Sequence, residues 1–142
     1  MNGNPEQGPI AGVTPHLAIA DGRAGEAIDW YVRAFGAEER LRMPHDDGKR
    51  LMHAHLVING GSLMLVDDFP EYSGRRVGVP EGVWMHLQVD DADRWFARAV
   101  EAGGEPTMPL SDTFWGDRYG QLRDPFGHRW SIGSAINKGE GA

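Results

Sequence analysis

Residues 30–34 read Trp-Tyr-Val-Arg-Ala, and residues 95–99 read Trp-Phe-Ala-Arg-Ala. A second pair of similar segments, residues 16–19 and 86–89, precedes these two in the same order. Each copy therefore begins with a short apolar strand and continues into a helix. The connection between strand and helix is five residues longer in the first copy. Because two copies are too few for a solenoid, the repeat indicates a duplication that produced two related modules.

Apolar side chains recur at spacings of three and four over residues 25–35, as Ile28, Tyr31, Val32 and Phe35, and again over about 92–102, which predicts one amphipathic helix in each module. Asn59-Gly60 predicts a two-residue hairpin turn, because both central residues of a type I′ turn need positive φ. Asp124-Pro-Phe-Gly127 is typical of a type I turn. Strands are predicted at residues 13–20, 51–58, 62–67, 83–89, 107–110, 119–123 and 129–132.

The segments outside the two modules are rich in Gly and polar residues. They predict a disordered lead-in at residues 1–11 and a tail at residues 137–142. We expect a single domain between them, made of residues 12–136, with modules at about 13–68 and 83–134 and an irregular connector at 69–82.

The composition excludes several classes of protein. The chain has 142 residues and no Cys, so disulfides, thiolate nucleophiles and Cys-ligated metals are excluded. Twenty-one acidic residues against 14 Lys and Arg give a net charge of −7, which disfavours nucleic acid and anionic membrane surfaces as partners. No stretch approaches the about 20 apolar residues of a membrane span, and the N-terminus lacks signal-peptide features. We expect a cytoplasmic protein.

Alternation along the predicted strands sorts their side chains onto two faces. One face is apolar and matches the stripes of the two helices. The opposite face is polar, aromatic and rich in His, where a merely solvent-exposed face would carry Thr, Lys and Glu. This indicates a concave surface that holds a ligand, although a dimer partner or a lid loop could also cover it. The residues predicted to line it are His16, His53, His55, Trp84, His86, Tyr119, Gln121, Arg129 and Ser131.

The segment before residue 119 adds two aromatic side chains. Phe114 and Trp115 could form a rim that stacks on a planar or cationic ligand, or could pack on a dimer partner. In the second case, Asp117 and Arg118 are expected to form a surface ion pair of little energy. Four acids are expected to be solvated turn residues: Asp46, Asp47, Asp67 and Asp68.

Two segments then suggest a family. Residues 112–120 read Asp-Thr-Phe-Trp-Gly-Asp-Arg-Tyr-Gly, and residues 124–132 read Asp-Pro-Phe-Gly-His-Arg-Trp-Ser-Ile. Together with the repeat and the sheet faces, they make the chain resemble the vicinal oxygen chelate superfamily of glyoxalases, bleomycin-resistance proteins and extradiol dioxygenases. Residues 25–31, 35–38 and 63–65 resemble its PhnB-like branch.

The resemblance covers about residues 13–134 and implies a fold. That fold is α+β, with paired βαβββ modules whose eight strands form a curved mixed sheet around a cup-shaped cavity. The helices lie on the outer face. The resemblance also implies a homodimer.

Metal-using members of this superfamily bind a divalent ion through His and Glu side chains inside the cup. The corresponding positions here are Thr14 or His16, Trp84, the vicinity of Leu65, and Ser131. Trp and Leu cannot ligate a metal and Ser is a poor ligand, so the prediction is that no metal is bound. An alternative site remains open, because His53 and His55 lie about 6.5–7 Å apart on one strand face. That alternative would use His16, His53, His55 and His86.

The predicted function is therefore metal-free, cofactor-free binding of a small molecule by a homodimer. No nucleophile elbow, Walker loop or dinucleotide fingerprint is present. His55 or His86 could act as a general base if the protein is an enzyme. The alternatives are a metal-dependent lyase, isomerase or dioxygenase that uses the cup histidines, sequestration of a cationic antibiotic, and a structural dimer with a vestigial cup.

Overall fold

A computed structural model describes residues 7–136, so the first six residues of the predicted lead-in and the whole predicted tail lie outside the described residues. The chain divides into two compact units, residues 1–78 and residues 79–142. Within residues 7–136, no helix is long and apolar enough to cross a membrane.

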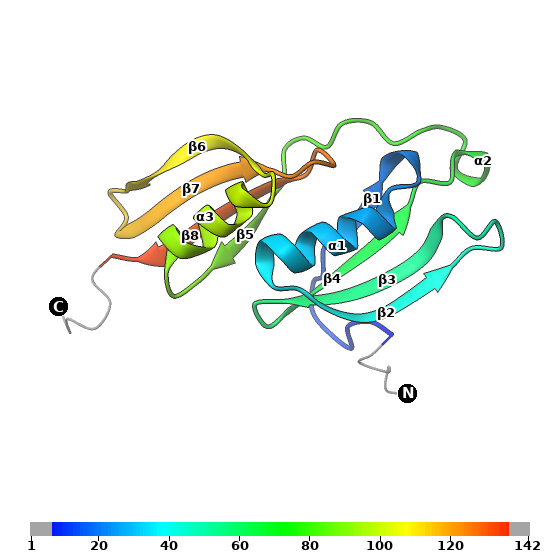
Figure 1. The fold of residues 1–142 in the computed structure, drawn as a ribbon, viewed down its shortest axis with the longest axis horizontal. Helices are drawn as coiled ribbons and strands as arrows, with labels where there is room; N and C mark the ends of the chain where they lie inside the picture. Colours follow the sequence, from blue (N-terminus) through cyan, green and yellow to red (C-terminus); the bar gives the residue numbers. More distant parts are fainter. Residues whose placement is uncertain (1–6, 137–142) are drawn as a thin grey trace. The chain divides into compact units, whose positions relative to one another are not determined.

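The first unit is a four-stranded mixed sheet with one long helix (Figure 1). Its strand order is β1-β4-β3-β2, with β1 parallel to β4 and the other neighbours antiparallel. Its elements are β1 (His16–Ile19), a 3-10 turn η1 (Ala20–Gly22), α1 (Ala24–Phe35), β2 (Glu38–Pro44), β3 (Leu51–Ile58), β4 (Gly61–Asp67) and α2 (Pro70–Ser73).

The second unit repeats this topology. Its strand order is β5-β8-β7-β6, with β5 parallel to β8 and the other neighbours antiparallel. The predicted α+β fold of paired βαβββ modules is confirmed, and its eight strands are hydrogen-bonded as two four-stranded sheets. The elements of this unit are β5 (Trp84–Gln88), α3 (Ala92–Glu101), β6 (Glu105–Asp112), β7 (Asp117–Arg123) and β8 (Arg129–Ala135).

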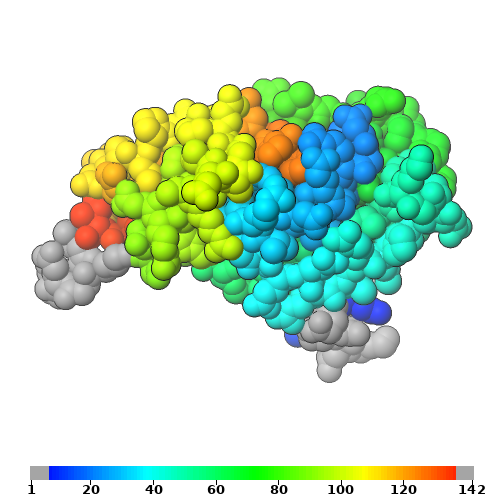
Figure 2. Space-filling model, viewed as in Figure 1, coloured from blue at the N-terminus to red at the C-terminus, as the bar shows by residue number. Residues whose placement is uncertain are grey.

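Each long helix covers one face of its own sheet. Figure 2 shows α1 at the surface of the first unit, on the side turned to the viewer. Helix α1 buries Ile28, Tyr31 and Phe35 as its apolar stripe predicts, and it also buries Trp30. Val32, which the same stripe placed in the core, is 40% exposed, because the buried arc of the helix is centred closer to Trp30.

A side chain from the last strand of each sheet holds the start of each helix. The Asp67 carboxylate accepts hydrogen bonds from the backbone N–H groups of Ala24 at 2.9 Å and Leu51 at 2.6 Å. Asp67 is 2% exposed, so the expectation of a solvated turn residue was wrong for it. In the second unit, the Ser134 hydroxyl accepts from the N–H of Ala92 at 3.0 Å. The bonds from Ala24 and Ala92 satisfy first-turn donors that a helix leaves without an internal partner.

The differences between predicted and observed strands lie mostly at sheet edges. Strand β2 was not predicted from the sequence. Its residues Glu-Glu-Arg-Leu-Arg-Met-Pro are mostly charged, so the alternation of polar and apolar residues is too short to indicate a strand. Strand β6 is longer than predicted and carries Pro106 and Pro109, which an edge strand tolerates. The hairpin turn is confirmed, with positive φ at Asn59 (50°) and Gly60 (82°). The predicted turn after β7 is closed by the N–H of Gly127, which donates to the carbonyl of Asp124 at 3.1 Å.

Candidate functional site

The face of the second sheet opposite α3 gathers most of the predicted ligand-binding residues. Strand pairing places Trp84 opposite Arg129, and places both His86 and Gln121 opposite Ser131. We call this surface the second polar face. It comprises Trp84, His86, Gln88, Tyr119, Gln121, Arg123, Arg129 and Ser131.

Hydrogen bonds fix the imidazole of His86 at the centre of the second polar face. Its Nε2 lies 2.7 Å from Gln88 Oε1, and its Nδ1 lies 2.7 Å from Ser131 Oγ. Because an amide oxygen only accepts, Nε2 carries the proton, and in the neutral ring Nδ1 accepts from the Ser131 hydroxyl. Gly133 makes room for this arrangement, since a Cβ there would lie 3.2 Å from His86 Cε1. The ring is thus held in one orientation.

A row of aromatic rings extends from His86 to the loop before β7. The rings of His86 and Tyr119 are stacked with centroids 5.9 Å apart, and Trp115 meets Tyr119 edge-on at 5.4 Å. Phe114 meets Trp115 at 5.1 Å but is 97% exposed. The Tyr119 hydroxyl accepts from Gln121 Nε2 at 3.1 Å. The structure therefore joins the predicted rim residues to the polar face within one unit.

The expected pairing of Asp117 with Arg118 was wrong. Arg118 projects from the other side of β7 and pairs instead with Asp93 at 3.2 Å and Asp112 at 3.3 Å. Alternation along β7 explains this outcome, because neighbouring residues of a strand point to opposite faces.

Two members of the second polar face were not predicted as site residues, Gln88 and Arg123. Gln88 is two residues after His86 on β5, and Arg123 is two residues after Gln121 on β7. Alternation along the two strands already places both on the same side as these neighbours, but neither was selected as a site residue. Arg123 lies directly opposite Arg129, whose guanidinium carbon is 5.5 Å from the centroid of the Trp84 ring.

The first sheet carries the other three predicted histidines on its face opposite α1, which we call the first polar face. Both His16 and His55 pair with Met64, and His53 precedes His55 by two residues on β3. His55 is buried, and its Nε2 lies 2.9 Å from Ser62 Oγ. His53 Nε2 contacts the carbonyl of Gln7. Burial, followed by repulsion from His53, lowers the pKa of His16 below the usual histidine value.

These residues do not fit a metal ion bound within either unit. Across residues 7–136, no three His, Asp or Glu side chains are grouped closely enough to hold one. Of the carried-over ligand positions, Trp84 lacks a donor, Ser131 is bonded to His86, and Leu65 is buried. A borderline divalent ion needs three or four imidazole, thiolate or carboxylate ligands. Within either unit, the described side chains therefore do not form a three-ligand group.

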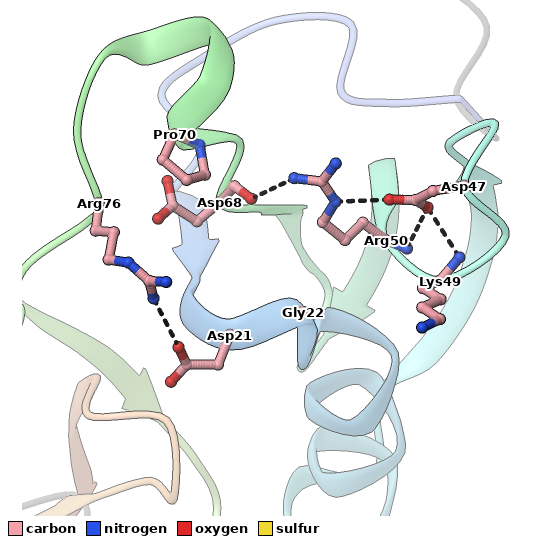
Figure 3. A pocket seen from close by; sticks show the side chains of 8 residues that line it. All are labelled: Asp21, Gly22, Asp47, Lys49, Arg50, Asp68, Pro70 and Arg76. Atoms are coloured by element: carbon pink, nitrogen blue, oxygen red, sulfur yellow. Dashed lines mark hydrogen bonds and ion pairs between the residues drawn. The ribbon is translucent and has the colours of Figure 1, made fainter.

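A separate pocket of about 340 Å³ lies in the first unit, beside the loop between β2 and β3 (Figure 3). Arg50 crosses it, donating to Asp47 Oδ2 at 2.7 Å and to Glu71 Oε2 at 2.6 Å. The Arg50 guanidinium lowers the pKa of Glu71 to about 2. The pocket is lined by Asp21, Gly22, Asp47, Lys49, Arg50, Asp68, Pro70 and Arg76.

The charges of this pocket largely neutralise one another. Arg50 also donates to the backbone carbonyl of Asp68 at 3.4 Å, so it ties the β2–β3 loop to the segment that starts α2. Arg76 pairs with Asp21 at 3.4 Å. Because the principal cation already has its carboxylates, this pocket is best explained as a link between loops. The second polar face is the better candidate for ligand binding.

Comparisons with known proteins agree with this fold. A protein of Mycobacterium tuberculosis (strain ATCC 25618 / H37Rv) described as "Uncharacterized protein Rv0887c" is 46% identical over 131 residues, covering 89% of this chain and 75% of that protein. Among solved structures, TioX from Micromonospora sp. ML1 is 30% identical, with a TM-score of 0.64 and coverage of 88% of this chain and 100% of that one. The PhnB protein from Bacillus cereus is 22% identical with a TM-score of 0.71, covering 88% and 100%, which shows the fold alone.

A family model also matches most of the chain. The family model of the glyoxalase/bleomycin resistance protein/dioxygenase superfamily matches residues 14–132, which include both modules and all the residues of the second polar face. The chain therefore belongs to the glyoxalase/bleomycin resistance protein/dioxygenase superfamily.

Proposed function

We propose that this protein binds a small planar molecule on the second polar face without a metal. The observation that carries the proposal is the fixed ring of His86, hydrogen-bonded on both nitrogens and continued by the rings of Tyr119 and Trp115. Aromatic rings offer a large contact area with few rotatable bonds, so little conformational entropy is lost when a planar ligand stacks on them. Polar groups beside them would fix its orientation.

Binding is favoured over hydrolysis at the same residues. His86 and Ser131 are within hydrogen-bond distance, as a base and a nucleophile would be. Ser131, however, is 2% exposed, so its hydroxyl is not accessible to a substrate. The group that orients His86 is the neutral amide of Gln88, which cannot stabilise an imidazolium as a carboxylate does. The same contacts suit a rigid binding surface.

The finer assignments belong to this proposal. We place the chain in the PhnB-like branch on the basis of residues 25–31, 35–38 and 63–65, and we expect a cytoplasmic homodimer. Sequestration of a cationic antibiotic is the weaker candidate. The aromatic row would suit such a drug, but Arg123 and Arg129 on the same face would repel its charge.

A thermal-shift screen of a chemically diverse library tests the proposal. We expect stabilising compounds whose effect is lost in Trp84→Ala and retained in Val83→Ala, a neighbouring exposed residue that precedes β5. Elemental analysis of the untagged protein should accompany the screen. A library without hits, or hits unaffected by Trp84→Ala, would contradict the proposal, and one tightly held ion per chain would favour the metal-dependent alternative.

A further inference from the structure

The second polar face contains two arginines whose charges are only partly compensated. Arg123 and Arg129 are directly opposite each other on the neighbouring strands β7 and β8. Side chains at directly opposed positions have Cβ atoms about 4.5–5.5 Å apart, and like charges there destabilise a sheet. Such a pair calls for an anion to offset the repulsion.

The anionic partners within the protein are few. Arg123 Nη1 lies 3.7 Å from Glu105 Oε1, too far for a hydrogen bond. No carboxylate lies within ion-pair distance of Arg129 among residues 7–136, and its guanidinium lies instead over the ring of Trp84. Two guanidinium groups against one carboxylate leave a local positive charge on a chain whose net charge is −7.

The hydrogen-bonding capacity of the pair is also incomplete. The Nε atoms of both Arg123 and Arg129 are buried and lack a hydrogen-bond partner. Buried donors are normally paired, so an unpaired one needs an explanation. Both unpaired guanidinium nitrogens occur at one cross-strand pair, next to the aromatic residues of the proposed site. When the side chain turns Nε towards the surface, Nε together with one Nη forms the edge of a guanidinium that binds an oxyanion with two parallel hydrogen bonds.

We propose that Arg123 and Arg129 anchor an oxyanion, a carboxylate or a phosphate, carried by the planar ligand of the second polar face. This inference rests on the proposed function and specifies its class of ligand. Ser131 is two residues from Arg129 on the same strand face, about 6.5–7 Å away, and is bonded to His86. An anionic group at the arginines would therefore place the adjoining ring system against His86 and Tyr119.

Nuclear magnetic resonance of the arginine Nε–Hε groups tests the inference on the intact chain. The probes are benzoate and phenyl phosphate, with neutral benzamide and cationic benzamidine as matched controls. We expect both anions to shift the Nε–Hε signals of Arg123 and Arg129, and the controls to leave them unchanged. The anion that acts at the lower concentration tells whether the site prefers a carboxylate or a phosphate.

Variants locate the effect. Arg123→Gln and Arg129→Gln should each weaken binding of the preferred anion about 10- to 100-fold, as expected for a lost charge-assisted hydrogen bond. Arg129→Lys keeps the charge but loses the planar edge, and should also weaken binding. Arg118→Gln is the control, because Arg118 is on the opposite side of β7 and pairs with Asp93 and Asp112.

Several outcomes would overturn the inference. If neither anion shifts the Nε–Hε signals of the wild-type protein, the inference is overturned before any variant is measured. The inference is also overturned if benzamide binds as tightly as benzoate. It is likewise overturned if Arg118→Gln weakens anion binding as much as Arg123→Gln and Arg129→Gln do. If library ligands depend on Trp84 but not on either arginine, the oxyanion anchor fails while the proposed function stands. If no ligand depends on Trp84, the proposed function fails as well.

Discussion

The two modules share one backbone pattern and differ in the chemistry of their polar faces. In the first, His16 and His55 both lie opposite Met64, and in the second, His86 and Gln121 both lie opposite Ser131. The register is therefore the same. Met64 offers His16 no hydroxyl, whereas the Ser131 hydroxyl holds His86 by a hydrogen bond at 2.7 Å.

Two residues further along, the difference becomes one of charge. Val57 pairs with Ser62 in the first module, and Arg123 pairs with Arg129 at the corresponding positions of the second. Neither change affects the apolar side on which the helices pack. The side of a sheet opposite its helix can thus differ in chemistry between the modules while the fold is maintained, and here the second module carries two arginines where the first has Val57 and Ser62.

The largest expected effect concerns the bonds that hold the two helices. Asp67→Ala should lower the free energy of unfolding by about 3 kcal/mol, because two buried N–H groups, of Ala24 and Leu51, lose their acceptor. Ser134→Ala should cost only about 1 kcal/mol, because a single helix-start N–H, of Ala92, is affected. Urea unfolding measures both. Equal losses would contradict the view that Asp67, which also holds the start of β3, stabilises its unit more than Ser134 does.

The second prediction concerns the space beside His86. Gly133→Ala places a Cβ 3.2 Å from His86 Cε1 and 3.3 Å from Gln88 Oε1, so the ring must move by a few tenths of an ångström. We expect ligand affinity in the library assay to fall about fivefold, which corresponds to about 1 kcal/mol of overpacking. The control is Gly61→Ala in the first module, where the nearest atom to a new Cβ is the Ile58 carbonyl oxygen at 3.7 Å. An unchanged affinity in Gly133→Ala would show that the position of His86 does not matter.

The third prediction concerns the pH dependence of stability that arises from the first polar face. Burial and His53 lower the pKa of His16, so in the range just below the usual histidine pKa the unfolded chain binds more protons than the folded one. Stability should therefore fall as the pH falls through this range. His16→Gln should flatten this part of the melting-temperature profile, and His53→Gln should raise the pKa of His16. A His16 that titrates at or above the usual value would contradict the assignment.

The smallest effect is expected at the Arg50 pocket. Arg50→Ala removes the bonds to Asp47 and Glu71 and should lower the melting temperature less than Ser134→Ala does, with the loss shrinking at high salt. The lowered pKa of Glu71, about 2, means that this contribution is present at neutral pH and is lost as the pH falls from the usual glutamate range towards 2. Arg76→Ala is the control, since Arg76 is 79% exposed. A similar fall in melting temperature in both variants would indicate that Arg50 does not hold the β2–β3 loop to the segment that starts α2.

The sequence was sufficient for the fold because its signals were periodic. The Trp-x-x-Arg-Ala repeat marked both helices, and alternation along β3, β5 and β7 placed His53, His86 and Tyr119 on one side of their strands. The edge strand β2 was missed because most of its residues are charged, and its alternation is limited to Arg40-Leu-Arg-Met43. Asp67 was misjudged because its two N–H partners come from other elements, Ala24 and Leu51, far away in sequence.

The candidate site was predictable residue by residue but not as a network. Strand parity identified His86, Gln121 and Ser131, yet only the pairing of strands brings Ser131 to His86, 45 residues earlier in the chain. The unpaired Nε atoms of Arg123 and Arg129 had no sequence signal, because hydrogen-bond satisfaction depends on tertiary packing.

Chemical-shift mapping of the strongest library ligand on isotope-labelled protein tests the central claim most directly. The account predicts that the shifted signals include the indole N–H of Trp84, the ring of His86 and the Nε–Hε groups of Arg123 and Arg129. It would be contradicted by shifts confined to the first module, around His16, His53 and His55 or around Arg50. In that case the second polar face would be a surface without a ligand, and the chemical difference between the modules would need another explanation.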